Sequence, residues 1–130
     1  MMISHSIGTI IAYNALRNLG RDQQDLTVKQ FVTMGSPLGL TPVRARVYRG
    51  REYSRIPVRT PSIVTERWVN YSDRKDRVAA ESHLRGDYRS NDNGIRVADN
   101  LIHNDYLALD EERNPHKSVG YLRTPEISDQ

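Results

Sequence analysis

The sequence predicts an α/β fold, with a mostly parallel sheet and helices beside it. Apolar stretches of strand length recur along the chain, and helical or long irregular segments separate them. Parallel strands need such crossover connections, whereas antiparallel strands are commonly joined by short turns. A length of 130 residues is typical of a single domain. We therefore expect residues 1–130 to form one α/β domain.

The first predicted unit is a strand, a tight turn and a helix. The short apolar run Met1–Ile3 is followed by the turn Ser4–Gly8. After this turn, mostly apolar residues recur near helical spacing: Ile7, Ile10, Ile11, Ala15 and Leu19. Gly20 stands where a C-cap glycine would end the helix.

Three further strands are predicted along the rest of the chain. The apolar pattern of Val28–Met34 predicts a buried strand. It is expected to end at Gly35-Ser36-Pro37, because glycine and proline interrupt strands. Arg67–Tyr71 is the second of these strands, and Ile95–Ile102 alternates imperfectly and forms a weaker third. Lys117–Leu122 is expected to form a last turn of helix. The predicted sheet is narrow for an α/β protein.

The segment Leu38–Ser62 has no sustained periodicity, and we expect an irregular excursion that serves as a candidate lid. Arginines are concentrated here: Arg44, Arg46, Arg49, Arg51, Arg55 and Arg59. A basic segment can bind nucleic acid or an anionic membrane. However, the segment contains only two aromatic residues, Tyr48 and Tyr53, on which bases could stack. We therefore favour a solvated loop and expect no nucleic-acid partner.

The composition excludes several classes of protein. Hydrophobic residues make up 37% of the chain and the net charge is only +3, which indicates a small core rather than disorder. The absence of cysteine excludes a thiol nucleophile, a disulfide scaffold and cysteine-bound metals. No apolar run predicts a transmembrane segment or a signal peptide, so we expect a cytoplasmic chain. The histidine spacing predicts no metal site, and we expect no cofactor.

The turn Ser4-His5-Ser6-Ile7-Gly8 differs from the nucleophile motif G-x-S-x-G only at its first small residue. In that motif the serine lies on a strained turn between a strand and a helix, and only small residues fit two positions before and after it. Ser6 is therefore the candidate nucleophile, and the Ile7 N–H is a candidate oxyanion donor. The alternative is a plain strand–helix junction with Ser4 as the N-cap.

A catalytic serine needs a base and an acid that orients the base. In proteins whose nucleophile lies on such a turn, the nucleophile elbow, these residues follow in the order Ser, Asp or Glu, His. Asp76 lies just after a predicted strand, and His116 lies in a loop after the last one. Asp73 is an alternative acid or a residue that caps the turn. We therefore favour Asp76 as the acid and keep Asp73 as the alternative.

The other histidines are weaker candidates for the base. His103 follows a strand directly, but its apolar neighbours indicate a packed side chain. His5 adjoins the nucleophile, yet its side chain is expected to point away from Ser6. His83 lies in a polar loop and is expected at the surface.

The chain resembles the C-terminal part of serine esterases and lipases of the α/β-hydrolase superfamily. Four blocks carry the resemblance and span most of the chain: His5–Tyr13, Phe31–Gly39, Trp68–Ala79 with both aspartates, and His116–Leu122. It implies Ser6 as nucleophile, Asp76 as acid and His116 as base. It also implies hydrolysis of a small-molecule or lipid ester through an acyl-enzyme.

The chain differs from members of this family on the N-terminal side of the turn Ser4–Gly8. Family members place several strands and helices there, together with a loop that gives a second oxyanion donor, whereas only Met1–Ile3 precede the turn here. We therefore expect a partial hydrolase fold, truncated at its N-terminal side and comprising the C-terminal half of the sheet. Such a chain is expected to self-associate or to need a complementing N-terminal half. The alternative function is a non-catalytic remnant or interaction module.

Overall fold

The computed structural model of the chain describes residues 1–23, 25–49 and 58–129. Four parallel strands form one sheet in the order β1 (Met2–His5), β2 (Val28–Met34), β3 (Val64–Asp73) and β4 (Ala98–Ile102). The spatial order equals the chain order, so β1 and β4 are the two edges. The predicted α/β class and parallel pairing are confirmed.

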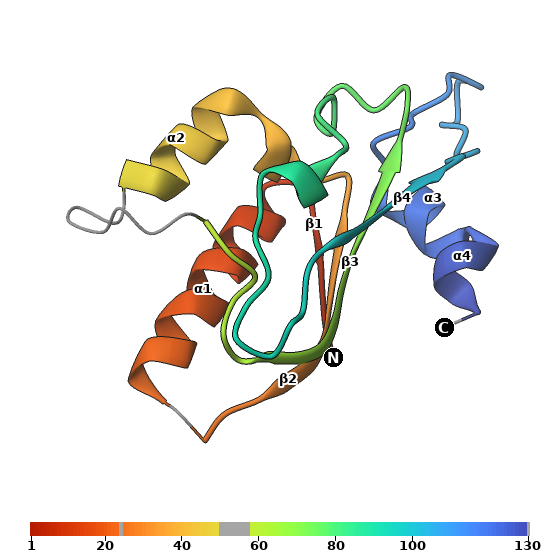
Figure 1. Cartoon of the computed structure of the whole chain (residues 1–130). Helices are drawn as coiled ribbons and strands as arrows, with labels where there is room; N and C mark the ends of the chain where they lie inside the picture. Colours follow the sequence, from red (N-terminus) through yellow and green to blue (C-terminus); the bar gives the residue numbers. More distant parts are fainter. Residues whose placement is uncertain (24, 50–57, 130) are drawn as a thin grey trace.

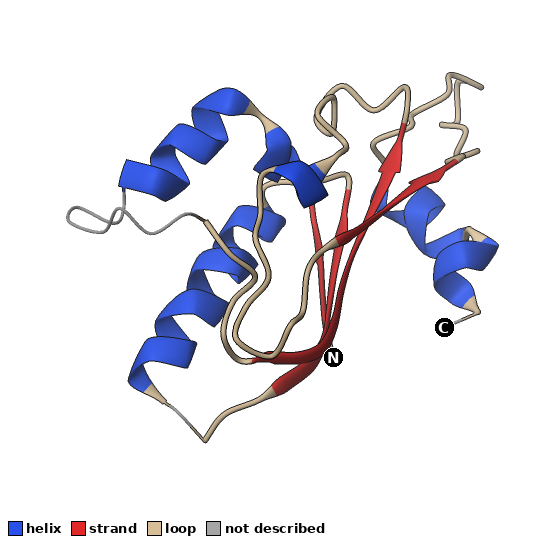
Figure 2. Cartoon of the chain, viewed as in Figure 1, coloured by secondary structure: helices blue, strands red, loops and turns tan. Residues whose placement is uncertain are grey.

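Helices cover both faces of this sheet, as Figures 1 and 2 show. Helix α1 (Gly8–Asp22) and helix α2 (Thr41–Arg49) lie on one side of it. The short helices α3 (Ser118–Arg123) and α4 (Pro125–Ser128) lie on the other. Two 3₁₀ turns, Pro37–Gly39 and Leu84–Gly86, complete the helical elements of the described residues.

The hydrophobic core consists of two clusters, one on each face of the sheet, because successive side chains of a strand point to opposite faces. Phe31 and Trp68 are fully buried on the α1 face, where Trp68 packs against the ring of Phe31 at a centroid distance of 5.3 Å. Their strand neighbours Val32 and Val69 point to the opposite face and pack with Tyr121 of α3. Burial of side chains of this size stabilises the fold by about 1.5–3 kcal/mol each.

The segment Leu38–Ser62, expected to be irregular, contains the helix α2. Pro42 lies in its first turn, where the missing N–H of proline costs no hydrogen bond. Val43 and Val47 are one turn apart and pack on the core, but the arginines between them obscure this stripe in the sequence. Residues 50–57, with Arg51 and Arg55, lie outside the described residues.

Helix α1 continues past Gly20 to Asp22, so the predicted C-cap at Gly20 is wrong. This glycine instead permits a close approach between α1 and the loop before β3. A Cβ atom at Gly20 would lie 2.8 Å from the Ile63 Cγ2 atom and would also collide with Ser62. This close approach depends on the absence of a side chain at Gly20.

Strand β4 starts later than the predicted Ile95. Asn91 accepts hydrogen bonds from the N–H groups of Asn93 and Ile95 through its side chain, which bends residues 91–95 into a turn. Such Asx turns compete with extended structure. The strand therefore begins only at Ala98.

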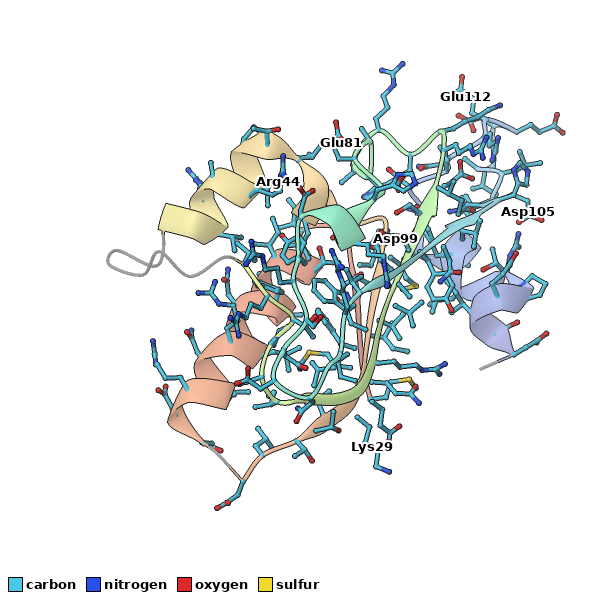
Figure 3. The ribbon with its side chains drawn as sticks, viewed as in Figure 1. Lys29, Arg44, Glu81, Asp99, Asp105 and Glu112 are labelled. Atoms are coloured by element: carbon cyan, nitrogen blue, oxygen red, sulfur yellow. The ribbon has the colours of Figure 1, made fainter. Side chains whose placement is uncertain are left out.

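Several charged side chains lie exposed on the outside of the chain, among them Lys29, Glu81, Asp105 and Glu112 in Figure 3. None of the helices in the described part of the chain combines the length and the apolar character that crossing a membrane requires.

Candidate active site

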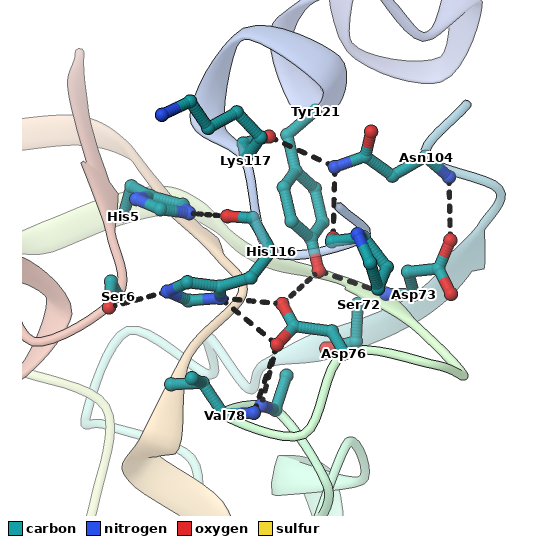
Figure 4. A network of polar contacts seen from close by, with 12 residues as sticks. His5, Ser6, Ser72, Asp73, Asp76, Val78, Asn104, His116, Lys117 and Tyr121 are labelled. Carbon is teal, nitrogen blue, oxygen red and sulfur yellow. Dashed lines mark hydrogen bonds and ion pairs between the residues drawn. The ribbon is translucent and has the colours of Figure 1, made fainter. Parts of the chain in front are cut away.

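The candidate site lies at the carboxyl ends of three parallel strands. Ser6 directly follows β1, Asp76 lies three residues after β3, and His116 is in the loop between β4 and α3. The carboxyl ends of parallel strands meet at one edge of a sheet, where α/β proteins commonly bind their ligands. The three side chains lie together there, as Figure 4 shows.

Ser6 occupies a strained turn between β1 and α1. Its φ of +56° is in the left-handed region that few non-glycine residues adopt. The turn is fixed on both sides: the Ser6 N–H donates to the Met34 carbonyl at 3.0 Å, and the Thr9 hydroxyl donates to the Ser6 carbonyl at 2.7 Å. The side chain of Ser6 is consequently held clear of the helix that follows.

One expectation about this turn is wrong. Only a small residue was expected to fit at Gly8, yet a Cβ atom there would meet no atom within 4 Å. The physical reason is that β1 is an edge strand, so nothing in the described chain packs beside the turn at this point. Ser4, the other small residue, hydrogen-bonds through its hydroxyl to the Val32 carbonyl.

His116 links the serine to the acid. Its Nε2 atom lies 2.8 Å from the Ser6 Oγ, and its Nδ1 atom lies 2.9 Å from the Asp76 Oδ2. An ionised carboxylate only accepts hydrogen bonds, so Nδ1 carries the proton and Nε2 is free to accept from the hydroxyl. This is the tautomer that a general base for Ser6 requires.

The Asp76 carboxylate is buried and fully surrounded by donors. Oδ1 accepts from the Val78 N–H at 2.9 Å, and Oδ2 accepts from the Tyr121 hydroxyl at 2.7 Å. Burial, as the main cause, raises the pKa of Tyr121 above its ordinary value, so the hydroxyl stays protonated and keeps donating. No local pattern indicates this role of Tyr121, because its partner is 45 residues away in the chain.

Asp73, the alternative acid, is also buried but does not contact His116. Its Oδ2 accepts from the Arg113 guanidinium at 2.9 Å and from the Asn104 N–H at 2.7 Å, and its Oδ1 accepts from the Lys75 N–H. The structure therefore brings Asp76, and not Asp73, to the imidazole. Asp73 instead ties the loop after β4 to the end of β3.

The remaining histidines lie apart from the serine hydroxyl. His103 was expected to be packed, but it is exposed and its Nδ1 lies 3.0 Å from the Arg113 guanidinium. His103 directly follows the edge strand β4, where its apolar neighbours do not cover it. His83 is exposed, as expected. His5 contacts the loop that bears His116, a contact that the sequence did not indicate.

The N-terminus of α1 lies beside the candidate nucleophile. Ile7 is the N-cap of this helix, and within the described residues its N–H has no hydrogen-bond partner. Helix N-termini carry unpaired N–H groups and a partial positive charge, which favour a developing anion. The Ile7 N–H is therefore free to donate to an oxyanion.

Gly35 is essential to the packing around the acid and the base. It follows β2 with a φ of +53°, and a Cβ atom there would lie 2.8 Å from the Asp76 Oδ2 and 3.2 Å from the His116 Nδ1. We expect Gly35→Ala to displace this pair and to lower the stability by about 1–3 kcal/mol. Urea unfolding followed by circular dichroism measures the loss.

Gly94→Ala is the matched control for this prediction. Gly94 also has a positive φ, +76°, but a Cβ atom there would meet nothing within 4 Å. Both variants share the backbone strain, and only Gly35→Ala adds the collision. Equal stabilities of the two variants would contradict the steric role of Gly35.

Comparison with known protein families, curated proteins and solved structures finds no match for the chain. Among the described residues, no group of three or more His, Asp or Glu side chains is arranged to hold a metal ion.

Proposed function

We propose that the chain is a serine hydrolase of the esterase or lipase type, related to the α/β-hydrolases, that cleaves small-molecule or lipid esters through an acyl-enzyme. The observation that carries the proposal is the continuous contact from the Ser6 Oγ through His116 to Asp76, at 2.8 and 2.9 Å. A hydroxyl is a weak nucleophile unless a base accepts its proton. This arrangement provides that base and fixes its tautomer.

In the first half of the reaction, the Ser6 Oγ attacks the ester carbonyl while His116 accepts the hydroxyl proton at Nε2. The negative charge of Asp76 stabilises the imidazolium that forms. The tetrahedral intermediate collapses when His116 returns the proton to the alkoxide, which leaves as an alcohol. The acyl group then remains on Ser6.

In the second half, water takes the place of the alcohol. His116 accepts a proton from the water, and the resulting hydroxide attacks the acyl carbonyl. The acid leaves, and Ser6 recovers its proton from His116. The Ile7 N–H supports both steps by donating to the oxyanion; loss of one such donor typically costs about 10²–10³ in rate.

Trapping of the acyl-enzyme tests this proposal. We expect the chain to release p-nitrophenolate from p-nitrophenyl butyrate faster than buffer does. Quenching in acid during turnover should leave a fraction of the protein heavier by one butyryl group, as measured by intact-mass spectrometry. A folded chain that shows neither effect would contradict the proposal.

A second candidate, a non-catalytic interaction module, is favoured by the exposed edge of the sheet. Strand β1 pairs only with β2 among the described residues, and Ile3, Ile7 and Ile11 near this edge are 46%, 67% and 67% exposed. Unprotected edges with apolar side chains promote association. The acyl-trapping experiment discriminates between the two functions, because only the hydrolase forms the adduct.

A further inference from the structure

Three successive backbone carbonyls in the loop that bears His116 accept hydrogen bonds from side chains. The Asn104 side-chain amide donates to the Pro115 carbonyl and to the Lys117 carbonyl, both at 2.9 Å. Between them, the His116 carbonyl is 2.7 Å from the His5 Nε2. Figure 4 shows His5 and Asn104 approaching this loop from different sides.

The Asn104 side of this arrangement is rigid. Asn104 is completely buried, its backbone N–H donates to the Asp73 carboxylate at 2.7 Å, and its Oδ1 accepts from the Tyr106 N–H. A Cβ atom at Gly120 would collide with the Asn104 amide, so α3 packs tightly against it. The carbonyls on either side of His116 are thus fixed by a buried amide.

The His5 side fixes the base itself. A carbonyl only accepts hydrogen bonds, so the short contact requires that His5 carries a proton on Nε2. The ring of His5 also packs beside the ring of His116, with centroids 4.6 Å apart and planes tilted by 33°. His5 is anchored in turn by the β1–β2 pairing, in which it lies opposite Met34.

The charge state of His5 is compatible with this contact. Burial, as the main cause, lowers the pKa of His5 below its ordinary value of 6.5. His5 is therefore neutral near pH 7 and does not repel the imidazolium that forms on His116.

We propose that His5 is a positioning residue, which donates a hydrogen bond to the His116 carbonyl and, with Asn104, fixes the base against Ser6 and Asp76. This inference rests on the proposed hydrolase function. His5 acts on the reaction only through His116, because its polar contact is to the backbone of that residue and not to the Ser6 hydroxyl. A hydrogen bond so close to the base matters because small misplacements of catalytic groups cost up to about 10²-fold in rate.

Two substitutions distinguish the effect of the His5 N–H donor from the effect of its aromatic ring. His5→Phe keeps an aromatic ring but has no N–H, whereas His5→Gln keeps an N–H donor at nearly the same reach and removes the ring. The readouts are the rate of Ser6 labelling by a fluorophosphonate, kcat and KM for p-nitrophenyl butyrate, and the NMR signal of the His116 Nδ1–H. Circular dichroism and thermal unfolding identify variants that fold.

We expect His5→Phe to lower kcat and the labelling rate by about 10-fold to 100-fold with little change in KM. In His5→Gln both rates should return to within about threefold of the unsubstituted chain, since the donor is restored. The Nδ1–H signal should broaden in His5→Phe and persist in His5→Gln. Equal losses in both variants, or no loss in either, would overturn the proposal.

Failure of the hydrolase proposal gives a different pattern. If the unsubstituted chain neither labels nor hydrolyses the ester, the proposed function fails, and the NMR signal alone decides about His5. A signal that is broadened only in His5→Phe supports the positioning role without catalysis. A signal unchanged in both variants overturns it.

Discussion

Replacement of Ser6 by alanine is expected to abolish ester hydrolysis by the chain. The variant lacks the only hydroxyl that lies within hydrogen-bond distance of the His116 Nε2 in the described structure. In serine hydrolases, loss of the nucleophile lowers kcat by about 10⁶-fold and leaves a residual rate from binding and the oxyanion donors. Initial rates with p-nitrophenyl butyrate, at matched concentrations of folded protein, measure the effect.

Ser4→Ala is the matched control for this loss. Ser4 lies two residues before Ser6 and hydrogen-bonds to the Val32 carbonyl instead of the imidazole. We expect its rate to stay within about threefold of the unsubstituted chain, because this bond does not involve the imidazole and one neutral hydrogen bond contributes only about 1 kcal/mol. A Ser6→Ala variant as active as Ser4→Ala would rule out Ser6 as the nucleophile.

Asp76→Asn is expected to lower kcat by about 10⁴-fold. Two hydrogen bonds, from Val78 and Tyr121, hold the two carboxylate oxygens, so an amide in this place cannot accept at both. If the amide nitrogen faces His116, the imidazole must accept at Nδ1 and carry its proton on Nε2. That tautomer cannot take the proton of Ser6. The steady-state rate as a function of substrate concentration measures the change.

Asp73→Asn distinguishes the two aspartates. Asp73 is equally buried and also accepts backbone N–H groups, but its side-chain partner is the Arg113 guanidinium rather than the His116 imidazole. We expect this variant to lose stability, because it leaves a partly buried guanidinium without its carboxylate, and to lose less than about tenfold in kcat per folded molecule. A greater loss of kcat in Asp73→Asn than in Asp76→Asn would assign the acid to Asp73.

Much of the fold follows from local patterns. The run Val28–Met34 matches β2 because a strand in the interior of a parallel sheet carries apolar residues on both faces. Strand β3 begins at Val64, three residues before the predicted Arg67. The prediction missed this start because the polar, partly exposed Thr65 and Glu66 resemble a loop in the sequence. Helix α2 could not be recognised, because arginines lie between Val43 and Val47, the hydrophobic residues of its described part that pack on the core.

The three residues of the candidate site could be placed from the sequence because each follows a strand or its loop, and parallel topology brings such residues to one edge. The residues that hold them could not. The partner of Tyr121 is 45 residues away, and Asn104 donates across the loop to carbonyls 11 and 13 residues away; neither local propensity nor periodicity indicates that these groups meet. Asp73 and Asp76 are only three residues apart, so the choice between them required the folded contacts.

Reaction with a fluorophosphonate reports whether His116 and Asp76 activate Ser6, because the probe modifies a serine that acts as a nucleophile. The native chain is incubated with the probe, and the modified residue is mapped by peptide mass spectrometry beside heat-denatured protein and Ser6→Ala. We expect a single adduct on Ser6 that forms only in the native chain and is absent from both controls. A folded native chain without an adduct, or with an adduct on another residue, would contradict it.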